Sequence, residues 1–206
     1  MQTMTRRSLG LAGLVLMATA SAVWAQPAPT VRVRGEITKV DGTTLSVKLK
    51  SGENVIVKLA DPPRIAAMLK ASADEIKEGS FIGVSAMPQP DGVQKAYAIH
   101  IFMDAQKGVV ADRFSDWDSR PGSTMTNANV ATQVAGKDGQ DLLVKYKDGE
   151  KKVLIPAGIP IAKYAPGSAA DLKVGAKVFV AGATKQADGT LLAPNIAVGR
   201  DIDPPQ

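Results

Sequence analysis

The sequence predicts a mainly β protein made of two similar halves in tandem, each folded as a small five-stranded barrel. Much of the chain consists of short runs in which apolar and polar residues alternate, which is typical of strands with one buried face. Turns that contain glycine separate these runs. Three of the turns recur about 97 residues later: Asp41-Gly42 as Asp138-Gly139, Ser51-Gly52 as Asp148-Gly149, and Asp91-Gly92 as Asp188-Gly189. A repeated order of turns indicates a duplicated structural unit.

The first 25 residues carry the features of a secretory signal peptide. Arg6 and Arg7 precede an apolar stretch, Leu9–Ala22, and Val23-Trp24-Ala25 then supplies small or medium-sized residues at the −3 and −1 positions. The apolar stretch of about 15 residues is shorter than the roughly 20 that a spanning helix needs. We expect cleavage after Ala25 and a periplasmic or secreted protein with no transmembrane segment in the mature chain. The Sec and twin-arginine pathways both stay open, and a retained N-terminal anchor is the alternative.

Each copy should contain five strands and a short helix. In the first copy, the strands are expected at 31–40, 45–49, 55–59, 80–87 and 94–102. Asp61-Pro62-Pro63 interrupts the sheet after the third strand. Arg64–Lys70 is predicted to be helical, because Ile65, Met68 and Leu69 would lie on one side of a helix.

The second copy repeats this order with a shorter helical segment, which Pro166-Gly167 interrupts. Its strands are expected at 129–134, 142–147, 152–156, 176–183 and 191–199. Ser72–Gly79 and Ser168–Gly175 also match, since each has an acidic residue three positions after a serine and ends in glycine. This pattern predicts a short helical turn in the same place in both copies.

Three strands, a helix and two further strands make up the element order of the OB fold. The predicted fold class is therefore mainly β, with two tandem OB-like five-stranded barrels and a short helix between strands three and four of each. The predicted domains span 31–103 and 126–200, and 104–125 forms a linker. A pair of open β-rich sandwiches is the alternative.

Three runs of sequence carry a family resemblance. Glu75–Val84 and Asp171–Val180 share an acidic-aliphatic-Lys-x-Gly pattern, and Trp117–Asn127 reads Trp-Asp-x-x-Pro-Gly-Ser-x-Met-Thr-Asn. Together with the signal peptide and the tandem β units, these runs resemble exported bacterial OB-like proteins of unknown function. The resemblance covers most of the mature chain. It implies the fold and carries no catalytic residue or cofactor.

The composition excludes several classes of function. The chain has no cysteine, which excludes disulfides, thiolate metal sites and thiol catalysis, and its one histidine, His100, excludes a site with two histidine ligands. Aromatic residues make up 4%, and Tyr146 is the only one on the central strands, where OB domains stack nucleic-acid bases. We therefore expect no catalysis, no cofactor, no metal site and no nucleic-acid partner. The net charge of +5 favours only a weak attraction to anionic surfaces.

The linker is the best candidate for a binding site, because the segment from Met103 to Met125 has no counterpart in the repeat. An aromatic residue flanked by charges of both signs could form a recognition loop. The candidate residues are Arg113, Phe114, Asp116, Trp117, Asp118 and Arg120. The alternative is a strap between the domains, with Trp117 packed between the two barrels. Asp116-x-Asp118 resembles the start of a calcium loop, but the next glycine comes too late for one.

Two further features have both a functional and a structural interpretation. Lys48 and Lys50 recur as Lys145 and Lys147 on the polar face of the second strand, and could form a basic face for acidic glycans, phosphates or anionic lipid. Alternatively, these lysines keep the strands soluble. His100 could act as a general base or a ligand, or it could be a hydrogen-bonded structural histidine.

The sequence thus predicts an exported binding or interaction protein without catalytic activity. Its partner would be a periplasmic protein, a polymer or a small ligand. The alternative is a carrier of a small ligand or a metal ion, since barrel mouths and domain interfaces commonly form pockets.

Overall fold

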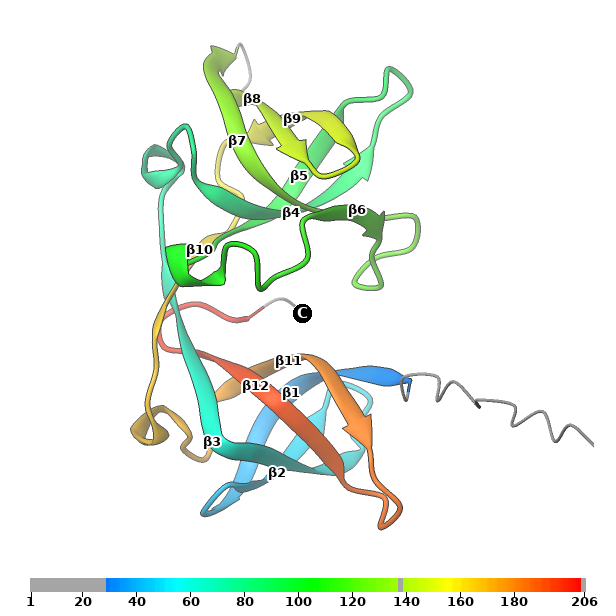
Figure 1. Cartoon of the computed structure of the whole chain (residues 1–206), viewed down its shortest axis with the longest axis vertical. Coiled ribbons are helices and arrows are strands. Elements are labelled where there is room, and N and C mark those ends of the chain that lie inside the picture. The colour runs from blue at the N-terminus through cyan, green and yellow to red at the C-terminus, as the bar shows by residue number, and fades with distance from the viewer. Residues whose placement is uncertain (1–28, 137–138, 205–206) are drawn as a thin grey trace, which may run out of the picture.

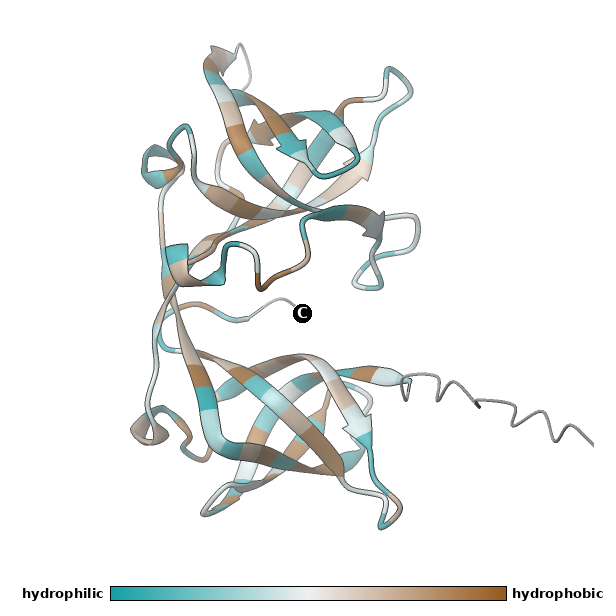
Figure 2. Cartoon of the chain, in the orientation of Figure 1, coloured by the Kyte–Doolittle hydropathy of each residue, from teal (hydrophilic) through white to brown (hydrophobic). Residues whose placement is uncertain are grey.

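The computed structural model describes residues 29–136 and 139–204, which form strands joined by turns and a few three-residue 3-10 helices (Figure 1). Residues 1–25, the predicted signal peptide, lie outside the described residues. In chain order, the strands are β1 (Thr30–Asp41), β2 (Thr44–Leu49), β3 (Asn54–Lys70), β4 (Phe81–Pro88), β5 (Gln94–Ile101), β6 (Arg113–Asp116), β7 (Thr124–Gly136), β8 (Gly139–Tyr146), β9 (Gly149–Pro156), β10 (Ile161–Pro166), β11 (Lys177–Lys185) and β12 (Leu191–Gly199). Along many of them apolar and polar residues alternate (Figure 2).

Five strands close into a barrel. β1 pairs with β2 and β11, β3 pairs with β2 and β12, and β11 pairs with β12. Alternate residues point inward and form a core that includes Ile37, Leu45, Val57, Val178 and Ile196. The prediction of a mainly β protein with a closed five-stranded barrel is confirmed.

The remaining core gathers five other strands in the order β5-β4-β7-β8-β9. β9 also pairs with β5, through Gln94↔Val153 and Lys95↔Leu154. Ile82, Val84 and Val144 are fully buried in this second core. We call the closed barrel the first strand group and these five strands the second strand group. Figure 1 shows the two groups as separate lobes.

Each strand group contains strands from both sequence copies. The first group joins the first three strands of the first copy to the last two strands of the second copy. The second group joins the first three strands of the second copy to the last two strands of the first copy. The 3-10 helices follow the same exchange, because Ile76 packs into the second core and Leu172 into the first. The predicted domains at 31–103 and 126–200 therefore do not correspond to the hydrogen-bonded groups, since chain order does not decide which strands pair.

The predicted helix at Arg64–Lys70 is wrong. The extended conformation that this segment adopts instead accounts for the exchange of strands. This segment continues β3, which is 17 residues long, and it pairs with β12 on one side and with β10 on the other. Two ladders of backbone hydrogen bonds outweigh the weak helical pattern of a seven-residue segment. A helix would return the chain to its own barrel, whereas an extended segment carries it to the second group.

β10 is the corresponding segment of the second copy. It runs antiparallel to β3, with Met68 opposite Tyr164, and the two strands cross side by side between the groups (Figure 1). The helical turns are 3-10 helices of three residues each at Ala73–Glu75 and Ala169–Asp171. The Ser72 and Ser168 backbone N–H groups each donate to the acidic side chain three residues later, at 3.1 and 2.8 Å.

A third, smaller cluster lies at the junction of the two groups. Met68, Ala162, Phe179 and Ala197 are buried there, and Trp117, Tyr164 and Ile202 pack against them. The C-terminal segment also passes between the two groups (Figure 1). Within the described part of the chain, no helix has the length and apolar character that crossing a membrane requires.

Candidate functional site

The pairing of one short strand with its neighbour holds much of the predicted linker at 104–125 in place. It contains a short 3-10 helix, Asp104–Gln106, and then β6, which pairs with β7. The turn between β6 and β7 spans 117–123, and we call it the β6–β7 loop. Its ends are joined because the Trp117 N–H donates to the Ser123 carbonyl oxygen at 2.8 Å. The Ser123 hydroxyl also donates to the Arg120 and Trp117 carbonyl oxygens at 2.8 and 3.1 Å, which gives the loop a defined shape.

Trp117 packs against the first strand group. The Arg32 and Arg34 guanidinium carbons lie 4.6 and 5.1 Å from its ring centre, and the Phe179 ring meets it edge-on at 6.3 Å. The indole Nε1 is buried and has no hydrogen-bond partner among the described residues. These surroundings are those of a packing anchor, as in the strap interpretation of the linker.

Asp118 ties the same loop to β1 by two ion pairs. Its carboxylate lies 3.0 Å from Arg32 Nη1 and 2.6 Å from Arg34 Nη2. Partial burial raises the pKa of Asp118, but the hydrogen bonds and charges of Arg34 and Arg32 outweigh this and hold the pKa below its ordinary value. A shallow pocket of about 300 Å³ beside this cluster is also lined by Lys50 and Ser119.

Arg120 points from the other side of the loop toward the second strand group. Its guanidinium carbon lies 3.9 Å from the centre of the Tyr97 ring, a close cation–π contact. The Tyr97 hydroxyl shares a hydrogen bond of 2.6 Å with the Ser119 hydroxyl. The loop therefore contacts both groups, through Trp117 and Asp118 on one side and Ser119 and Arg120 on the other.

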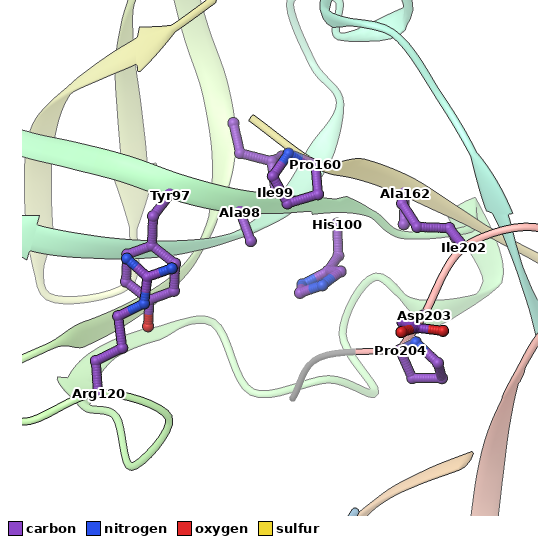
Figure 3. A pocket seen from close by; sticks show the side chains of 10 residues that line it. All are labelled: Tyr97, Ala98, Ile99, His100, Arg120, Pro160, Ala162, Ile202, Asp203 and Pro204. Atoms are coloured by element: carbon purple, nitrogen blue, oxygen red, sulfur yellow. The ribbon is translucent and has the colours of Figure 1, made fainter. Parts of the chain in front are cut away.

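A cavity of about 230 Å³ lies beside Arg120 at the junction (Figure 3). Four separate parts of the chain line it: β5, β10 with the preceding Pro160, the β6–β7 loop, and the C-terminal segment. The lining residues are Tyr97, Ala98, Ile99, His100, Arg120, Pro160, Ala162, Ile202, Asp203 and Pro204.

His100 lies in the wall of this cavity and is 6% exposed. Burial lowers its pKa to about 4, so the imidazole is neutral at pH 7. The Tyr164 ring packs edge-on against it, with 6.4 Å between ring centres. No hydrogen bond from the imidazole to a carboxylate occurs within the described residues. The imidazole therefore offers the cavity an uncharged donor and acceptor.

The structure brings only some of the predicted site residues together. Trp117, Asp118 and Arg120 share the β6–β7 loop, whereas Arg113, Phe114 and Asp116 lie on β6. Phe114 stacks with Tyr146 of β8 at 6.3 Å, and Lys151 Nζ lies 4.5 Å from its ring centre. This second aromatic contact braces β6 and lies away from the cavity lining.

The four lysines of the predicted basic face are divided between the two strand groups. Lys48 lies on β2 and Lys50 just after it, whereas Lys145 lies on β8 and Lys147 just after it. The sequence repeat placed them at equivalent strand positions, and these positions belong to different groups. Lys50 alone lies in the pocket beside Arg32 and Asp118.

Several residues of the site were not predicted. Arg32, Arg34, Tyr97 and Phe179 lie on strands and reach the loop only through the exchange of strands. The alternation Arg32-x-Arg34 on β1 is a signal in the sequence that could have found two of these residues. Across the described ranges, no three His, Cys, Asp or Glu side chains are grouped so that they could hold a metal ion.

Comparisons with known proteins return no relative. No protein-family model, no curated protein and no solved structure matches the chain.

Proposed function

We propose that this chain is an exported, non-catalytic binding protein that holds a small ligand in the cavity at the junction of its two strand groups. The observation that carries the proposal is the cavity itself. Segments far apart in the sequence converge to form its wall and leave about 230 Å³ between them. Cavities at such junctions are common ligand sites, and this volume lies below the roughly 300–1,000 Å³ of pockets for drug-sized molecules.

The fold assignment belongs to the same proposal. We infer that both strand groups are OB-like barrels, each completed by strands of the other copy. The pairing of β9 with β5 supports this for the second group. Export is inferred from the features of residues 1–25, with the mature chain beginning at Gln26 in the periplasm or outside the cell.

The geometry favours a small ligand over a large partner bound through Trp117. An aromatic hot spot of an interface is accessible before the partner binds, whereas Trp117 lies beneath Arg32 and Arg34 and against Phe179. A metal cargo has less support, because the described residues offer no cluster of ligands. The neutral His100 has no orienting carboxylate there, which supports a binding role rather than general-base catalysis.

Ligand binding can be tested by thermal unfolding of the chain 26–206 with a panel of fragment-sized organic acids, amides, alcohols and amines. A ligand at 100 times its Kd stabilises the folded state by about 2.7 kcal/mol, which raises the melting temperature measurably. Ala98→Leu fills part of the cavity and should abolish the shift. Ala111→Leu, at an exposed position outside the lining, should retain it.

Two results would contradict the proposal. In one, no member of the panel raises the melting temperature of the unmodified chain. In the other, Ala98→Leu and Ala111→Leu respond like the unmodified chain, which would place the binding site outside the cavity.

A further inference from the structure

We propose that the ligand of the junction cavity is a small organic monocarboxylate, with its carboxylate paired to Arg120 and its apolar body against the cavity wall. This inference rests on the proposed function and adds the chemical class of the ligand. It follows from how Arg120 is held, from the charges in the lining, and from the apolar character of the rest of the wall.

Arg120 is positioned but not neutralised. Its guanidinium stacks on Tyr97 at 3.9 Å, and the hydrogen bond between Tyr97 and Ser119 holds the ring against the same loop. No carboxylate within 4.0 Å pairs with Arg120 in the described part of the chain, whereas Arg32 and Arg34 both pair with Asp118. A planar guanidinium held by stacking presents its N–H donors in a fixed fork, which suits bidentate binding of a carboxylate.

The other charged side chain of the lining, Asp203, is already paired with a cation outside the cavity. Its carboxylate lies 2.6 Å from Lys177 Nζ. His100 is neutral at pH 7 because it is buried. The described lining therefore presents one uncompensated positive charge, from Arg120, which matches a ligand with one negative charge.

The rest of the wall is largely apolar. Ala98, Ile99 and Pro160 lie between Arg120 and Asp203 beside His100, and Ala162 and Ile202 line the end near Asp203 (Figure 3). A phosphate or sulfate ion would leave most of its oxygens against these side chains without hydrogen bonds, which is costly. A molecule with an apolar body and a single carboxylate satisfies both ends of the cavity.

The pocket beside Asp118 is a weaker candidate for an anion. It has three cations, Arg32, Arg34 and Lys50, but Asp118 already occupies the two arginines. An external anion would have to displace this carboxylate and so loosen the β6–β7 loop. Arg120 requires no such displacement.

The test measures Kd by isothermal titration calorimetry for three pairs of acid and amide: propionate and propionamide, butyrate and butyramide, and benzoate and benzamide. Members of a pair are similar in shape, but only the acid carries a charge. We expect at least one acid to bind the unmodified chain about tenfold or more tightly than its amide, since a charge-assisted bidentate pair distinguishes them.

Variants then assign the effect to Arg120. Arg120→Gln should weaken binding of that acid by about tenfold and leave the amide unchanged, because only the ion pair is lost. Arg64→Gln, at an exposed position of β3 outside the cavity lining, is the matched control and should leave both unchanged. The comparison of acid with amide uses the unmodified chain and does not depend on a variant that folds.

The outcomes separate this inference from the proposed function. Acid and amide that bind equally well, or an acid whose binding Arg120→Gln leaves intact, would overturn the carboxylate assignment while the cavity remains a binding site. Amides or alcohols that bind while all three acids fail would do the same. If no compound of any class binds, both proposals fail.

Discussion

His100 is a buried histidine whose protonation opposes folding. Burial lowers its pKa to about 4 in the folded chain, whereas an unfolded chain has the ordinary value of 6.5. Between these two values the unfolded chain binds a proton that the folded chain does not. The contribution of His100 to the free energy of unfolding is therefore complete above pH 6.5 and is lost as the pH falls toward 4.

The expected decrease between pH 7 and pH 4 from this one group is at most about 3 kcal/mol, by the usual conversion of a pKa difference. His100→Gln removes the titrating group and should flatten this part of the profile, as measured by urea unfolding at pH 7, 5.5 and 4.5. The carboxylates with lowered pKa values, such as Asp118, lose their contribution at lower pH in both proteins. A variant with the same decrease between pH 7 and 4.5 as the unmodified chain would show that His100 is not the cause.

At the scale of single residues, the sequence indicated which side chains were unusual but not what they contact. Trp117 and Arg120 stood out because their segment has no counterpart in the repeat. Tyr97 and Arg34 did not, since an aromatic or charged residue on a strand is ordinary. Their roles depend on a loop that reaches them from another part of the chain, and distances of this kind are not encoded in local patterns.

At the scale of elements, β1 and β2 approach too closely for a side chain at Gly35. A Cβ atom there would overlap the carbonyl oxygen of Lys48 and lie 2.8 Å from Val47 Cγ1. The backbone of a paired strand cannot move aside without breaking the ladder. Gly182 on β11 offers a contrast in the same barrel, since the nearest atom to its Cβ position, Thr30 Cβ, is 3.6 Å away.

Gly35→Ala should therefore lower the free energy of unfolding by about 2 kcal/mol or more, as overpacking against a fixed backbone does. Gly182→Ala should change it by no more than about 0.5 kcal/mol. Urea unfolding at pH 7 measures both. Equal effects of the two substitutions would mean that β1 and β2 do not pair in the register Gly35↔Leu49.

The strands themselves were largely predictable, because alternation and glycine turns are local signals. β2, β8 and β9 lie within a few residues of the predicted ranges. The extended conformation of Arg64–Lys70 was not predicted, since Ile65, Met68 and Leu69 fit one side of a helix as well as a strand that is covered on both faces. Ile65 packs on the first core and Met68 lies in the junction cluster, so tertiary contacts decided between two local possibilities.

At the scale of the whole molecule, the exchange of strands makes the two sequence copies depend on each other. Neither copy contains all five strands of either strand group. The segment near 107–109 is exposed and connects the copies, so a cut there leaves every strand intact.

Fragments 26–108 and 109–206 should consequently not be folded monomers when each is alone. Mixed in equal amounts, they should form a one-to-one complex with the β-sheet circular dichroism of the intact chain. Sedimentation and circular dichroism measure both properties. A fragment that unfolds cooperatively as a monomer would contradict the exchange and favour domains that are contiguous in sequence.

The sequence by itself determined the mainly β character and the order of most strands, because alternation and turn residues are properties of neighbouring positions. Only the tertiary structure decided which strands share a barrel, since an extended β3 and β10 carry the chain across rather than back. The same crossing creates the junction where Tyr97, His100, Arg120 and the C-terminal segment meet. The candidate site is therefore a product of long-range pairing, which a local pattern does not specify.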